Sequence, residues 1–451
     1  MEDTITAIAT ASGVSAINII KVSGKESIEI VNKIFKGHDL TVSNTYTIHY
    51  GYIEYNNEKI DEVLVSVFKS PKTYTGEDVV EINCHGGLAT TNKILEILLT
   101  SGCRLAEPGE FIKRAFLNGK KDLIEVEAVE DIINAKTEKA RKMSMNGVSG
   151  ILTDMIKNLK EKILSIIANI EVNIDYPEYE DAIEITNNIL KENINEIETS
   201  LNKILKESEK GKLIKNGIKV GIIGKPNVGK SSLLNRLLDE EKAIVTDIEG
   251  TTRDIVEGTI YINGITLYLI DTAGIRKTDN IVEQIGVQKS EKIIEEADLI
   301  IAIFDGSKEI TEEDYEILDK INSKKVLVII NKQDLNTKID LSKFEKYNII
   351  KCSVKNNQNI EKIYEEINKM FNLNELETND LTYISNARQI SLVKKSLEII
   401  KEIKKQNENQ TPVDLIQIDL QNLWETLGEI IGDSYKEELL DEIFSKFCLG
   451  K

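Results

Sequence analysis

The sequence has few of the features that define several classes of protein. Its 451 residues include only 4 cysteines and 5 prolines, and no apolar run approaches the roughly 18 residues that a membrane-spanning helix needs. The cysteines lie far apart, at Cys84, Cys103, Cys352 and Cys448. Such spacing excludes a disulfide-stapled scaffold and favours free thiols. Glu2 and Asp3 stand where a secretory signal would have its basic segment, so we expect a cytoplasmic protein without a membrane anchor.

Positively charged residues are also outnumbered, with 57 Lys and Arg against 76 Asp and Glu. The formal net charge is −19, which argues against an extended basic groove for nucleic acid. Any RNA contact must therefore use a local basic patch. With 41% hydrophobic and 29% charged residues, the composition is that of an ordinary globular protein, and the length predicts about three domains.

What the sequence does contain is a phosphate-binding pattern. Residues 224–231 read Gly-Lys-Pro-Asn-Val-Gly-Lys-Ser, which fits the P-loop pattern G-x-x-x-x-G-K-[ST]. A strand-like apolar run (218–223) precedes the loop, and residues 232–238 have apolar side chains at helical spacing. In that context Lys230 would reach the β- and γ-phosphates, and the Ser231 hydroxyl would bind Mg²⁺. The alternative is a glycine-rich loop that only turns a strand into a helix.

Three later motifs favour a guanine nucleotide. Strand-like runs lead into Asp-Thr-Ala-Gly (271–274), Asn-Lys-Gln-Asp (331–334) and Cys-Ser-Val-Lys (352–355). Asp271 is placed for a second Mg²⁺ contact. The Asp334 carboxylate is an acceptor pair that suits the N1–H and N2–H₂ donors of guanine, which adenine lacks. A backbone N–H in the last motif would meet guanine O6. The order of these motifs resembles the G domain of translation-factor-type GTPases.

The segments on either side of these motifs predict two further kinds of structure. In residues 1–118, an α+β domain is indicated by strand-like runs (16–22, 46–55, 62–68 and 79–84) and amphipathic helices (25–35 and 88–99). Cys84 and His85 are adjacent, but no further ligands follow at zinc spacing, so we expect no metal there. Apolar stripes predict helices over 122–168, 186–214, 380–406 and 411–447. Short connections between them indicate one helical bundle, into which the G domain is inserted.

Four segments in the N-terminal part carry a more specific resemblance. They are Thr-Gly-Glu-Asp (75–78), Cys-His-Gly-Gly (84–87), Ala-Glu-Pro-Gly-Glu-Phe (106–111) and Arg-Ala-Phe-Leu-Asn-Gly-Lys (114–120). These resemble the N-terminal domain of the MnmE (TrmE) family of tRNA modification GTPases, and the likeness runs along the whole chain. The resemblance implies an N-terminal folate-binding-like dimerisation domain (1–118), a helical domain in two halves (119–215 and 376–451) and an inserted Ras-like α/β G domain with a mixed sheet (216–375).

The resemblance also implies the residues of the nucleotide site. The expected GTP contacts are Asn227, Gly229, Lys230, Ser231, Ser232, Thr246, Thr252, Asp271, Gly274, Asn331, Lys332, Asp334 and Ser353. Ser231 and Thr252 would hold Mg²⁺. A K⁺ ion would be held by Asn227, Thr246, the Ile248 carbonyl and Thr251. Ile275 follows the Asp-x-x-Gly motif where many GTPases have a water-orienting Gln, so the expected catalytic residue is Glu283, acting through a bridging water.

A one-carbon folate, such as 5-formyltetrahydrofolate, is the second ligand that the resemblance implies. Its expected contacts are Lys21, Glu81, Lys120 and Lys451, with Lys21 standing where the family usually has Arg. Cys448 belongs to a Cys-x-Gly-Lys tail that the family needs for modification. Its role as a nucleophile or as a redox residue stays open, and the terminal Lys disfavours a prenylation site.

The function implied by the resemblance is that of a K⁺-activated GTPase and homodimer. With the flavoprotein MnmG, in a heterotetramer, it would form an aminomethyl or carboxymethylaminomethyl group at C5 of the wobble uridine of certain tRNAs. The alternative is a GTP-gated ribosome-assembly factor, for which a basic RNA-binding appendage would be expected. The folate-binding-like domain and the Cys448 tail favour tRNA modification.

Overall fold

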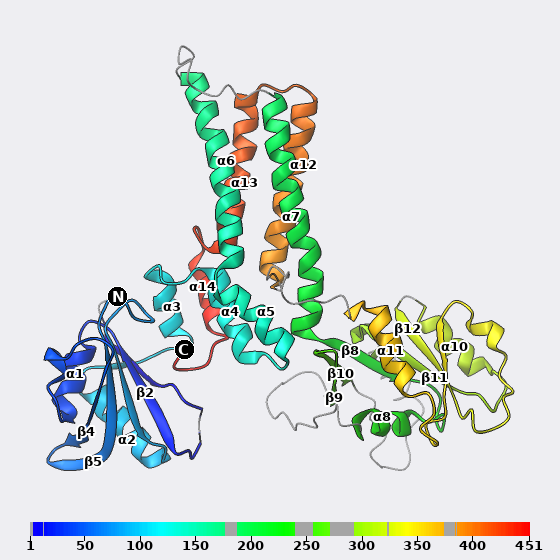
Figure 1. Cartoon of the computed structure of the whole chain (residues 1–451), viewed down its shortest axis with the longest axis horizontal. Helices are drawn as coiled ribbons and strands as arrows, with labels where there is room; N and C mark the ends of the chain where they lie inside the picture. The colour runs from blue at the N-terminus through cyan, green and yellow to red at the C-terminus, as the bar shows by residue number, and fades with distance from the viewer. Residues whose placement is uncertain are drawn as a thin grey trace. The chain divides into compact units, whose positions relative to one another are not determined.

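The computed structural model of the chain is shown in Figure 1 and describes residues 3–11, 13–175, 187–239, 256–270, 293–322, 324–373, 384 and 386–451. The chain forms two compact units. One consists of Met1–Glu130, Gly147–Leu201 and Ser391–Lys451, and the other of Asp131–Asn146 and Asn202–Ile390.

The first unit begins with a mostly antiparallel sheet. Its strands are β1 (Ile5–Ile8), β2 (Ile17–Ser23), β3 (Phe35–Lys36), β4 (Thr47–Tyr55), β5 (Glu58–Phe68), β6 (Val79–His85) and β7 (Arg104–Leu105). They lie in the order β3-β4-β5-β6-β2-β1-β7, with only the β1–β7 pair parallel among the described strands of this sheet. A 3₁₀ turn, η1 (Leu40–Val42), connects β3 to β4. This is an α+β arrangement, as the sequence predicts.

Helices cover one face of this sheet, and the other face, uncovered by helices, is partly open to solvent. Helices α1 (Ser27–Ile34) and α2 (Leu88–Thr100) pack with Val65 and other inward-facing strand residues in one buried cluster. Because side chains alternate along a strand, the residues between the buried ones point to the opposite face. There Ile48 and Leu64 remain 66% and 47% exposed. The outer face is therefore a partly apolar surface.

Three shorter helices join the two ends of the chain. They are α3 (Glu110–Leu117), α4 (Leu123–Asn134) and α14 (Glu437–Phe444). The ring of Phe116 lies 6.3 Å from that of Phe444 and 5.2 Å from that of Tyr435, between ring centroids. Leu123 and Ile443 belong to the same buried cluster. The C-terminal helix is thus packed on the helix that follows the N-terminal sheet.

Long helices follow where the sequence predicts a bundle. They are α6 (Ile151–Asp175), α7 (Asn187–Asn216), α12 (Ala387–Glu408) and α13 (Val413–Ile431), and Figure 1 shows them side by side. Polar contacts join α6 to α7 (Lys162–Glu196, 2.8 Å), α7 to α12 (Glu198–Lys404, 2.5 Å) and α6 to α13 (Glu171–Gln417, 3.0 Å). The predicted apolar face of α7 is buried at Ile194, Ile197 and Leu201.

The helical stretch predicted over 122–168 is divided rather than continuous. A separate helix, α5 (Glu138–Val148), lies between α4 and α6. Its start is capped by the Thr137 hydroxyl, which accepts a hydrogen bond from the Ala140 amide (3.1 Å). Its end is followed by Gly150, whose φ of +79° is a left-handed conformation that glycine adopts without strain.

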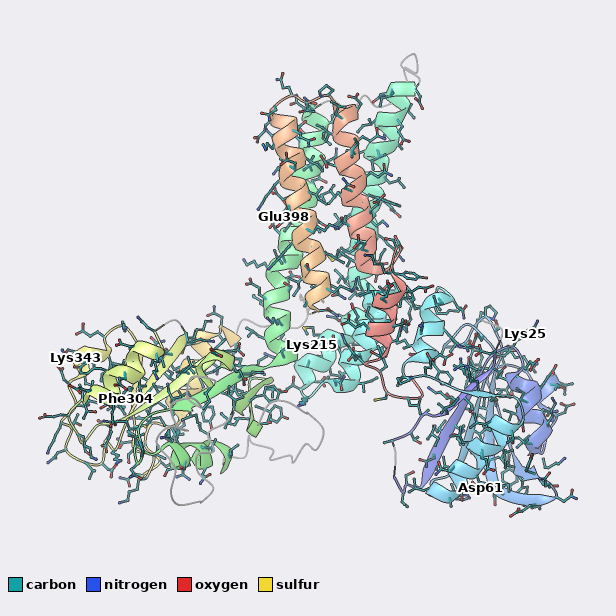
Figure 2. All side chains as sticks on the ribbon, turned by 180° about the vertical axis from the view of Figure 1, so that it is seen from behind. Lys25, Asp61, Lys215, Phe304, Lys343 and Glu398 are labelled. Carbon is teal, nitrogen blue, oxygen red and sulfur yellow. The ribbon has the colours of Figure 1, made fainter. Side chains whose placement is uncertain are left out.

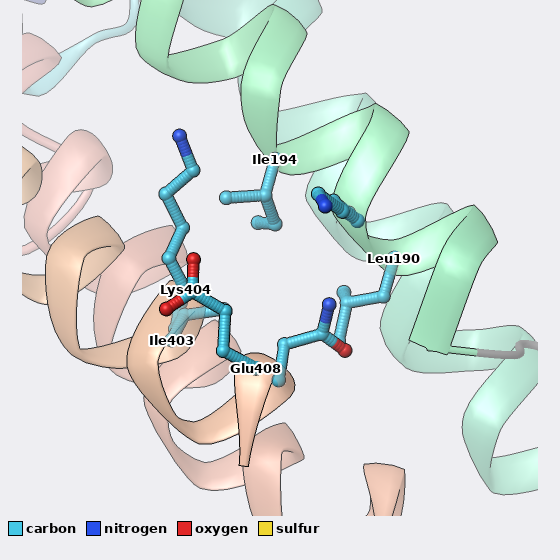
Figure 3. A pocket seen from close by; sticks show the side chains of 7 residues that line it. Leu190, Ile194, Ile403, Lys404 and Glu408 are labelled. Carbon is cyan, nitrogen blue, oxygen red and sulfur yellow. The ribbon is translucent and has the colours of Figure 1, made fainter. Parts of the chain in front are cut away.

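A small cavity lies between α7 and α12 (Figure 3). Its volume is about 20 Å³, and Leu190, Ile194, Ile403 and Asn407 are among its lining residues. The buried Asn407 Oδ1 accepts no hydrogen bond from the described residues. A space of this size has room for about one water molecule.

The G domain forms a second sheet, within the second unit. Its strands are β8 (Ile218–Ile223), β9 (Val256–Ile262), β10 (Ile265–Ile270), β11 (Leu299–Asp305), β12 (Lys325–Asn331) and β13 (Asn348–Lys351). The order is β13-β12-β11-β8-β10-β9, and β9 pairs antiparallel with β10 while the other pairs are parallel. The prediction of a mixed sheet is therefore confirmed.

Helices and a buried core surround this second sheet. The helices are α8 (Lys230–Asp239), α10 (Glu312–Lys320) and α11 (Glu361–Met370), with a 3₁₀ turn η2 (Leu341–Phe344). Phe304 on β11, labelled in Figure 2, is 1% exposed and lies 4.9 Å from the ring of Phe344. The carboxyl ends of the parallel strands meet at one edge, where ligands bind in open α/β sheets. In the part of the chain that the structure describes, no helix is both long and apolar enough to cross a membrane.

Candidate functional site

The P-loop lies between β8 and α8, as predicted, and two of its glycines occupy positions that no other residue fits. Gly224 has φ +154°, and a Cβ there would lie 2.4 Å from the Ile303 carbonyl oxygen. Gly229 has φ +109°, and its Cβ would lie 2.3 Å from Asn331 Nδ2. The loop therefore runs against β11 on one side and against the guanine motif on the other, which requires bare backbone at both places.

Lys230 is held across the loop by the backbone. Its Nζ donates hydrogen bonds to the carbonyl oxygens of Gly224 (2.6 Å) and Lys225 (2.8 Å). Burial lowers the pKa of Lys230. Ser231 and Ser232 follow in the first turn of α8, and Asn227 is exposed with φ +62°. The loop therefore leads into a helix N-terminus that carries the lysine and the two serines, which is the kind of place where phosphate binds in proteins.

Asn331 joins the phosphate side of the site to the guanine side. Its side chain is 4% exposed. Nδ2 donates to the Val228 carbonyl in the P-loop (2.8 Å), and Oδ1 accepts from the Val354 amide (3.0 Å). A single carboxamide therefore links its own motif to the P-loop and to the last motif, through residues 103 and 23 positions away in the sequence. Sequence reasoning places Asn331 in the site but does not reveal this bridging role.

The Asp334 carboxylate is held in place by the last motif. The Ser353 hydroxyl donates to Asp334 Oδ1 (2.6 Å), and this hydrogen bond lowers the pKa of Asp334. The amides of Ser353 and Val354 are already bonded within the protein, to Gln358 O and Asn331 Oδ1. Among the described residues, the next amide, that of Lys355, is the one in this turn left to meet a base carbonyl.

Two charged contacts around the nucleotide site were not predicted. Lys332, with φ +64°, donates from Nζ to Asp305 Oδ2 at the end of β11 (2.7 Å). In the P-loop, Lys225 Nζ donates to Asp314 Oδ2 (2.6 Å) and Thr311 Oγ1 (2.7 Å) at the start of α10. Asp305 ends a buried strand, which is the signal that could have identified it.

The expected switch residues lie outside the described residues. These are Thr246, Ile248, Thr251, Thr252, Asp271, Gly274 and Glu283. The contacts predicted for them with GTP, Mg²⁺ and K⁺ stay predictions.

Two of the residues expected to bind folate lie on neighbouring strands of the N-terminal sheet. Lys21 on β2 is directly opposite Glu81 on β6 in the antiparallel register. Burial lowers the pKa of Lys21, Glu81 opposes that shift, and the nearby Lys451 adds to it. The ammonium of Lys21 also lies 5.7 Å from the centre of the Tyr74 ring. The structure therefore places Lys21, Glu81 and Lys451 in one neighbourhood, and sequence reasoning missed Tyr74.

Lys120 reaches the same loop as Tyr74. A Cβ on Gly76 would lie 3.3 Å from Lys120 Cε, so the stem of this lysine packs against bare backbone. The loop of residues 70–78 therefore contacts both Lys21, through Tyr74, and Lys120, through Gly76.

The tail that carries Cys448 is docked on the start of α3. The Gly109 amide donates to the Cys448 carbonyl (3.4 Å), and the Phe111 amide donates to the Lys451 carbonyl (3.1 Å). Gly450 has φ +89°, and a Cβ there would lie 2.6 Å from the Ile8 carbonyl oxygen. Cys448 itself is exposed, whereas Cys84, Cys103 and Cys352 are buried. The tail is thus held on the N-terminal domain by hydrogen bonds, with its thiol accessible.

Comparisons with known proteins agree along the chain. Residues 123–448 match the family model described as the MnmE helical domain, and residues 4–120 match that of the GTP-binding protein TrmE N-terminus. The tRNA modification GTPase MnmE of Streptococcus thermophilus is 50% identical over 450 residues, which cover 100% of this chain and 98% of the relative. The protein of the same name from Streptococcus mutans is also 50% identical, with 100% and 99% covered.

A solved structure is similar to the G-domain part alone. It is the G domain of the T. maritima FeoB iron transporter, 29% identical over 34% of this chain and 97% of that chain, with a TM-score of 0.26. The sequence matches, which extend over the chain, carry the relationship.

Proposed function

Because the chain belongs to the MnmE family of tRNA modification GTPases, we propose that it is a K⁺-activated GTPase that works with the flavoprotein MnmG. The chain is a GTP hydrolase that takes part in tRNA modification. The proposed product is an aminomethyl or carboxymethylaminomethyl group at C5 of the wobble uridine. GTP hydrolysis would drive the G domains of a homodimer together and apart.

The observation that carries the GTP part is the Asn331 bridge between the P-loop and the guanine motif. With both sides joined, Asp334 would accept from the guanine N1–H and N2–H₂. Lys230, whose Nζ lies on the Gly224 and Lys225 carbonyl oxygens, would reach the phosphates. The hydroxyls of Ser231 and Thr252 are suited to hold Mg²⁺, which neutralises charge on the phosphate oxygens when bound. ATP would leave the Asp334 carboxylate without its donors, so the site would discriminate against it.

The proposed K⁺ dependence rests on Asn227. Its exposed side chain lies in the P-loop, and its carboxamide oxygen is a suitable ligand for a monovalent cation. Thr246, Ile248 and Thr251 would supply the remaining oxygens. We expect faster GTP turnover in KCl than in NaCl at matched ionic strength, and loss of that difference in Asn227→Ala. Equal turnover of the wild type in both salts would contradict the proposal.

Glu283 is the proposed water-positioning residue. Ile275 has no group that can orient water, and a carboxylate in direct contact with the γ-phosphate would be repelled, so Glu283 would act through a bridging water. We expect Glu283→Gln to slow turnover while leaving nucleotide affinity unchanged. Unchanged turnover would assign the role to another residue.

The proposed one-carbon site uses Lys21, Glu81, Lys120 and Lys451. The Glu81 carboxylate suits the paired donors of a pterin ring, and the lysines suit an anionic ligand. When bound, a folate such as 5-formyltetrahydrofolate supplies the carbon atom. Lys21 keeps the charge of the usual arginine without its planar fork. We expect calorimetry to detect binding of 5-formyltetrahydrofolate by the wild type and not by Glu81→Ala.

The uncovered face of the N-terminal sheet supports the proposed homodimer. Ile48 and Leu64 expose apolar surface there, and Glu81 and Lys21 lie on strands of the same sheet. Exposed apolar patches of this kind favour association. A heterotetramer with MnmG would then contain two copies of each chain.

The decisive experiment on the function is mass spectrometry of tRNA nucleosides. Cells lacking the gene would be complemented with the wild type, with Asp334→Asn or with Cys448→Ser. We expect the C5-modified wobble uridine to return only with the wild type. A nucleoside profile that deletion leaves unchanged would remove the tRNA-modification role, and ribosome profiles would then test the assembly-factor alternative.

A further inference from the structure

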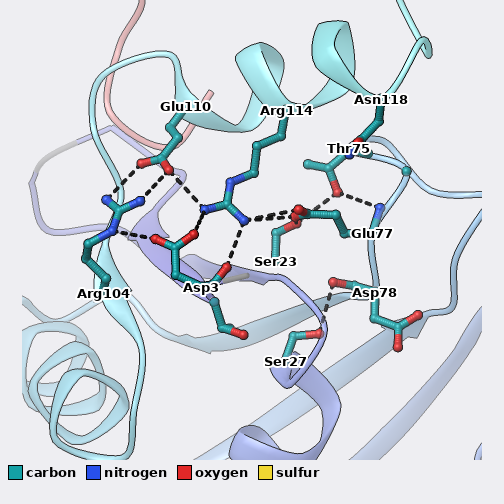
Figure 4. Close-up of polar contacts among 12 residues, drawn as sticks. Asp3, Ser23, Ser27, Thr75, Glu77, Asp78, Arg104, Glu110, Arg114 and Asn118 are labelled. Atoms are coloured by element: carbon teal, nitrogen blue, oxygen red, sulfur yellow. Dashed lines mark hydrogen bonds and ion pairs between the residues drawn. The ribbon is translucent and has the colours of Figure 1, made fainter. Parts of the chain in front are cut away.

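A buried arginine lies at the junction of α3, the chain's first residues and the loop of residues 70–78. Arg114 is 1% exposed, and its guanidinium contacts the carboxylates of Asp3, Glu77 and Glu110 (Figure 4). It also donates to the Asp3 carbonyl (2.9 Å). A buried cation requires several such partners, and each partner here comes from a different segment.

On one side, Arg114 fixes the 70–78 loop. Its Nη1 donates to both carboxylate oxygens of Glu77, at 3.1 and 3.2 Å. The Ser23 hydroxyl donates to Glu77 Oε2 (2.8 Å) and shares a second hydrogen bond with Thr75 Oγ1 (2.8 Å). Asn118 Nδ2, four residues beyond Arg114, donates to the Thr75 carbonyl (2.7 Å). The loop is therefore held by a connected set of polar contacts.

This loop is the one that contacts the candidate folate residues. Tyr74 lies beside Lys21, and Gly76 lies against Lys120. A change in the position of Glu77 would therefore move both contacts together.

On the other side, Arg114 fixes the first turn of α3. Its Nη2 donates to Glu110 Oε1 (3.0 Å), and Glu110 Oε2 accepts from the Glu107 amide (2.8 Å). Arg104 also binds Glu110, but Arg104 is 45% exposed, and none of the described contacts joins it to Glu77. Of the two arginines, Arg114 alone touches both the loop side and the helix side.

The first turn of α3 is where the Cys448 tail docks. Glu110 stands between Gly109 and Phe111, whose amides hold the carbonyl oxygens of Cys448 and Lys451. Fixing the Glu110 side chain therefore also fixes the amides that retain the tail.

We propose that Arg114 is a positioning residue for the one-carbon site, which it assembles by holding the 70–78 loop through Glu77 and the Cys448 tail through Glu110. This inference rests on the proposed folate-binding function. Arg114 touches neither ligand nor thiol in this role, and acts through the two segments that it joins.

The test separates the two sides of the arginine. Hydrogen exchange would be followed in the full chain at the amides of residues 70–78 and 109–111, with β5 as an internal reference. Glu77→Gln should speed exchange in the loop alone, Glu110→Gln at the start of α3 alone, and Arg114→Lys in both. Arg141→Lys is the matched control, because Arg141 pairs with Glu138 on an exposed helix face.

Binding of 5-formyltetrahydrofolate, measured by calorimetry, completes the test. We expect Arg114→Lys to weaken binding by about tenfold or more, the change that accompanies loss of one hydrogen bond between charged groups. Faster exchange in β5 as well would indicate general destabilisation and overturn the positioning role, as would unchanged folate affinity in Arg114→Lys. If the wild type binds no folate, the proposed function itself fails, and the exchange pattern still reports whether Arg114 joins loop and tail. The two Gln variants keep the test possible if Arg114→Lys does not fold.

Discussion

Asn331 and Arg114 are each buried side chains whose polar atoms join segments that are distant in the sequence. Asn331 uses one donor and one acceptor to join the P-loop to the turn at Val354. Arg114 uses two nitrogens to join Asp3, Glu77 and Glu110. Of the Arg114 guanidinium nitrogens, both Nη atoms have partners, whereas Nε has none among the described residues. Replacing a partner of either side chain would leave the buried atom that it contacts with fewer hydrogen bonds.

The loss of folding stability at low pH should depend on Glu110. Burial alone would raise the pKa of Glu110, but hydrogen bonds from Arg104, the Glu107 amide and Arg114 outweigh it and hold the pKa below its ordinary value of 4.5. The folded state then binds fewer protons than the unfolded state. The stabilisation that the ionised Glu110 carboxylate contributes is complete above about pH 4.5 and is lost as the pH falls through the lowered pKa.

We therefore expect the thermal midpoint of Glu110→Gln to fall less than that of the wild type as the pH is lowered below about 4.5. At neutral pH the variant should be less stable, by about 2 kcal/mol, because charged hydrogen bonds are lost. Glu402→Gln, on the exposed surface of α12, is the control. Parallel pH profiles of Glu110→Gln and the wild type would contradict the prediction.

Guanine affinity should depend on Ser353. Without its hydroxyl, the Asp334 carboxylate loses the hydrogen bond that orients it. We expect Ser353→Ala to weaken GDP binding by roughly five- to tenfold, as measured with a fluorescent GDP analogue. Ser342→Ala, in an exposed 3₁₀ turn (η2) outside the guanine motifs, should bind GDP as the wild type does. Equal affinities of the two variants would show that Ser353 does not orient Asp334.

At the scale of elements, α3 is fixed at its start by contacts with the other end of the chain. Gly109 at the start of α3 has φ +69°, and a Cβ there would lie 2.4 Å from the Phe444 carbonyl oxygen. Gly119, just after α3, has nearly the same φ, +67°, with nothing within 4 Å of an added Cβ. Comparing substitutions at Gly109 and Gly119 therefore separates the cost of backbone strain from the cost of disturbed packing between α3 and α14.

We expect Gly119→Ala to cost about 1 kcal/mol, the strain of a left-handed non-glycine residue. Gly109→Ala should cost clearly more, because the α14 backbone must move as well. It should also speed hydrogen exchange at Phe111, whose amide holds the tail. Thermal unfolding and exchange of both variants would check this, and equal effects of the two substitutions would exclude the packing explanation.

The elements themselves could be predicted better than their contacts. The strand before Gly224 and the buried face of α7 follow from local apolar spacing, which a sequence displays directly. The break at Gly150 was missed because a single glycine weighs little against a long helical pattern. The Asn331 bridge and the docking of Cys448 could not be predicted at all. Both depend on contacts between segments that lie far apart in the chain, which residue spacing does not record.

At the scale of the whole molecule, the uncovered face of the N-terminal sheet should determine the oligomeric state. Ile48 lies on that face and is 66% exposed. Ile418, on α13, is also 66% exposed but belongs to the helical bundle. A lysine at the centre of an apolar interface is costly, whereas a lysine on a free helix surface is not.

We therefore expect Ile48→Lys to shift the protein from dimer to monomer in sedimentation experiments at micromolar concentration, while Ile418→Lys stays dimeric. GTP binding by Ile48→Lys should remain intact, because the nucleotide site lies in the other compact unit. If both variants remain dimeric, the interface lies on another surface. If only Ile418→Lys dissociates, the interface lies on the helical bundle.

The docking of residues 448–451 on α3 also has a consequence for the order of events during synthesis. On the ribosome, α3 emerges more than three hundred residues before residues 448–451, whose carbonyl oxygens accept hydrogen bonds from the amides at the start of α3. Until then, the start of α3 faces water, and the neighbourhood of Lys21 lacks Lys451. The one-carbon site would therefore be completed late in translation. A chain released early would keep its P-loop and guanine motif yet lack a finished second site, which separates nucleotide binding from modification in truncated products.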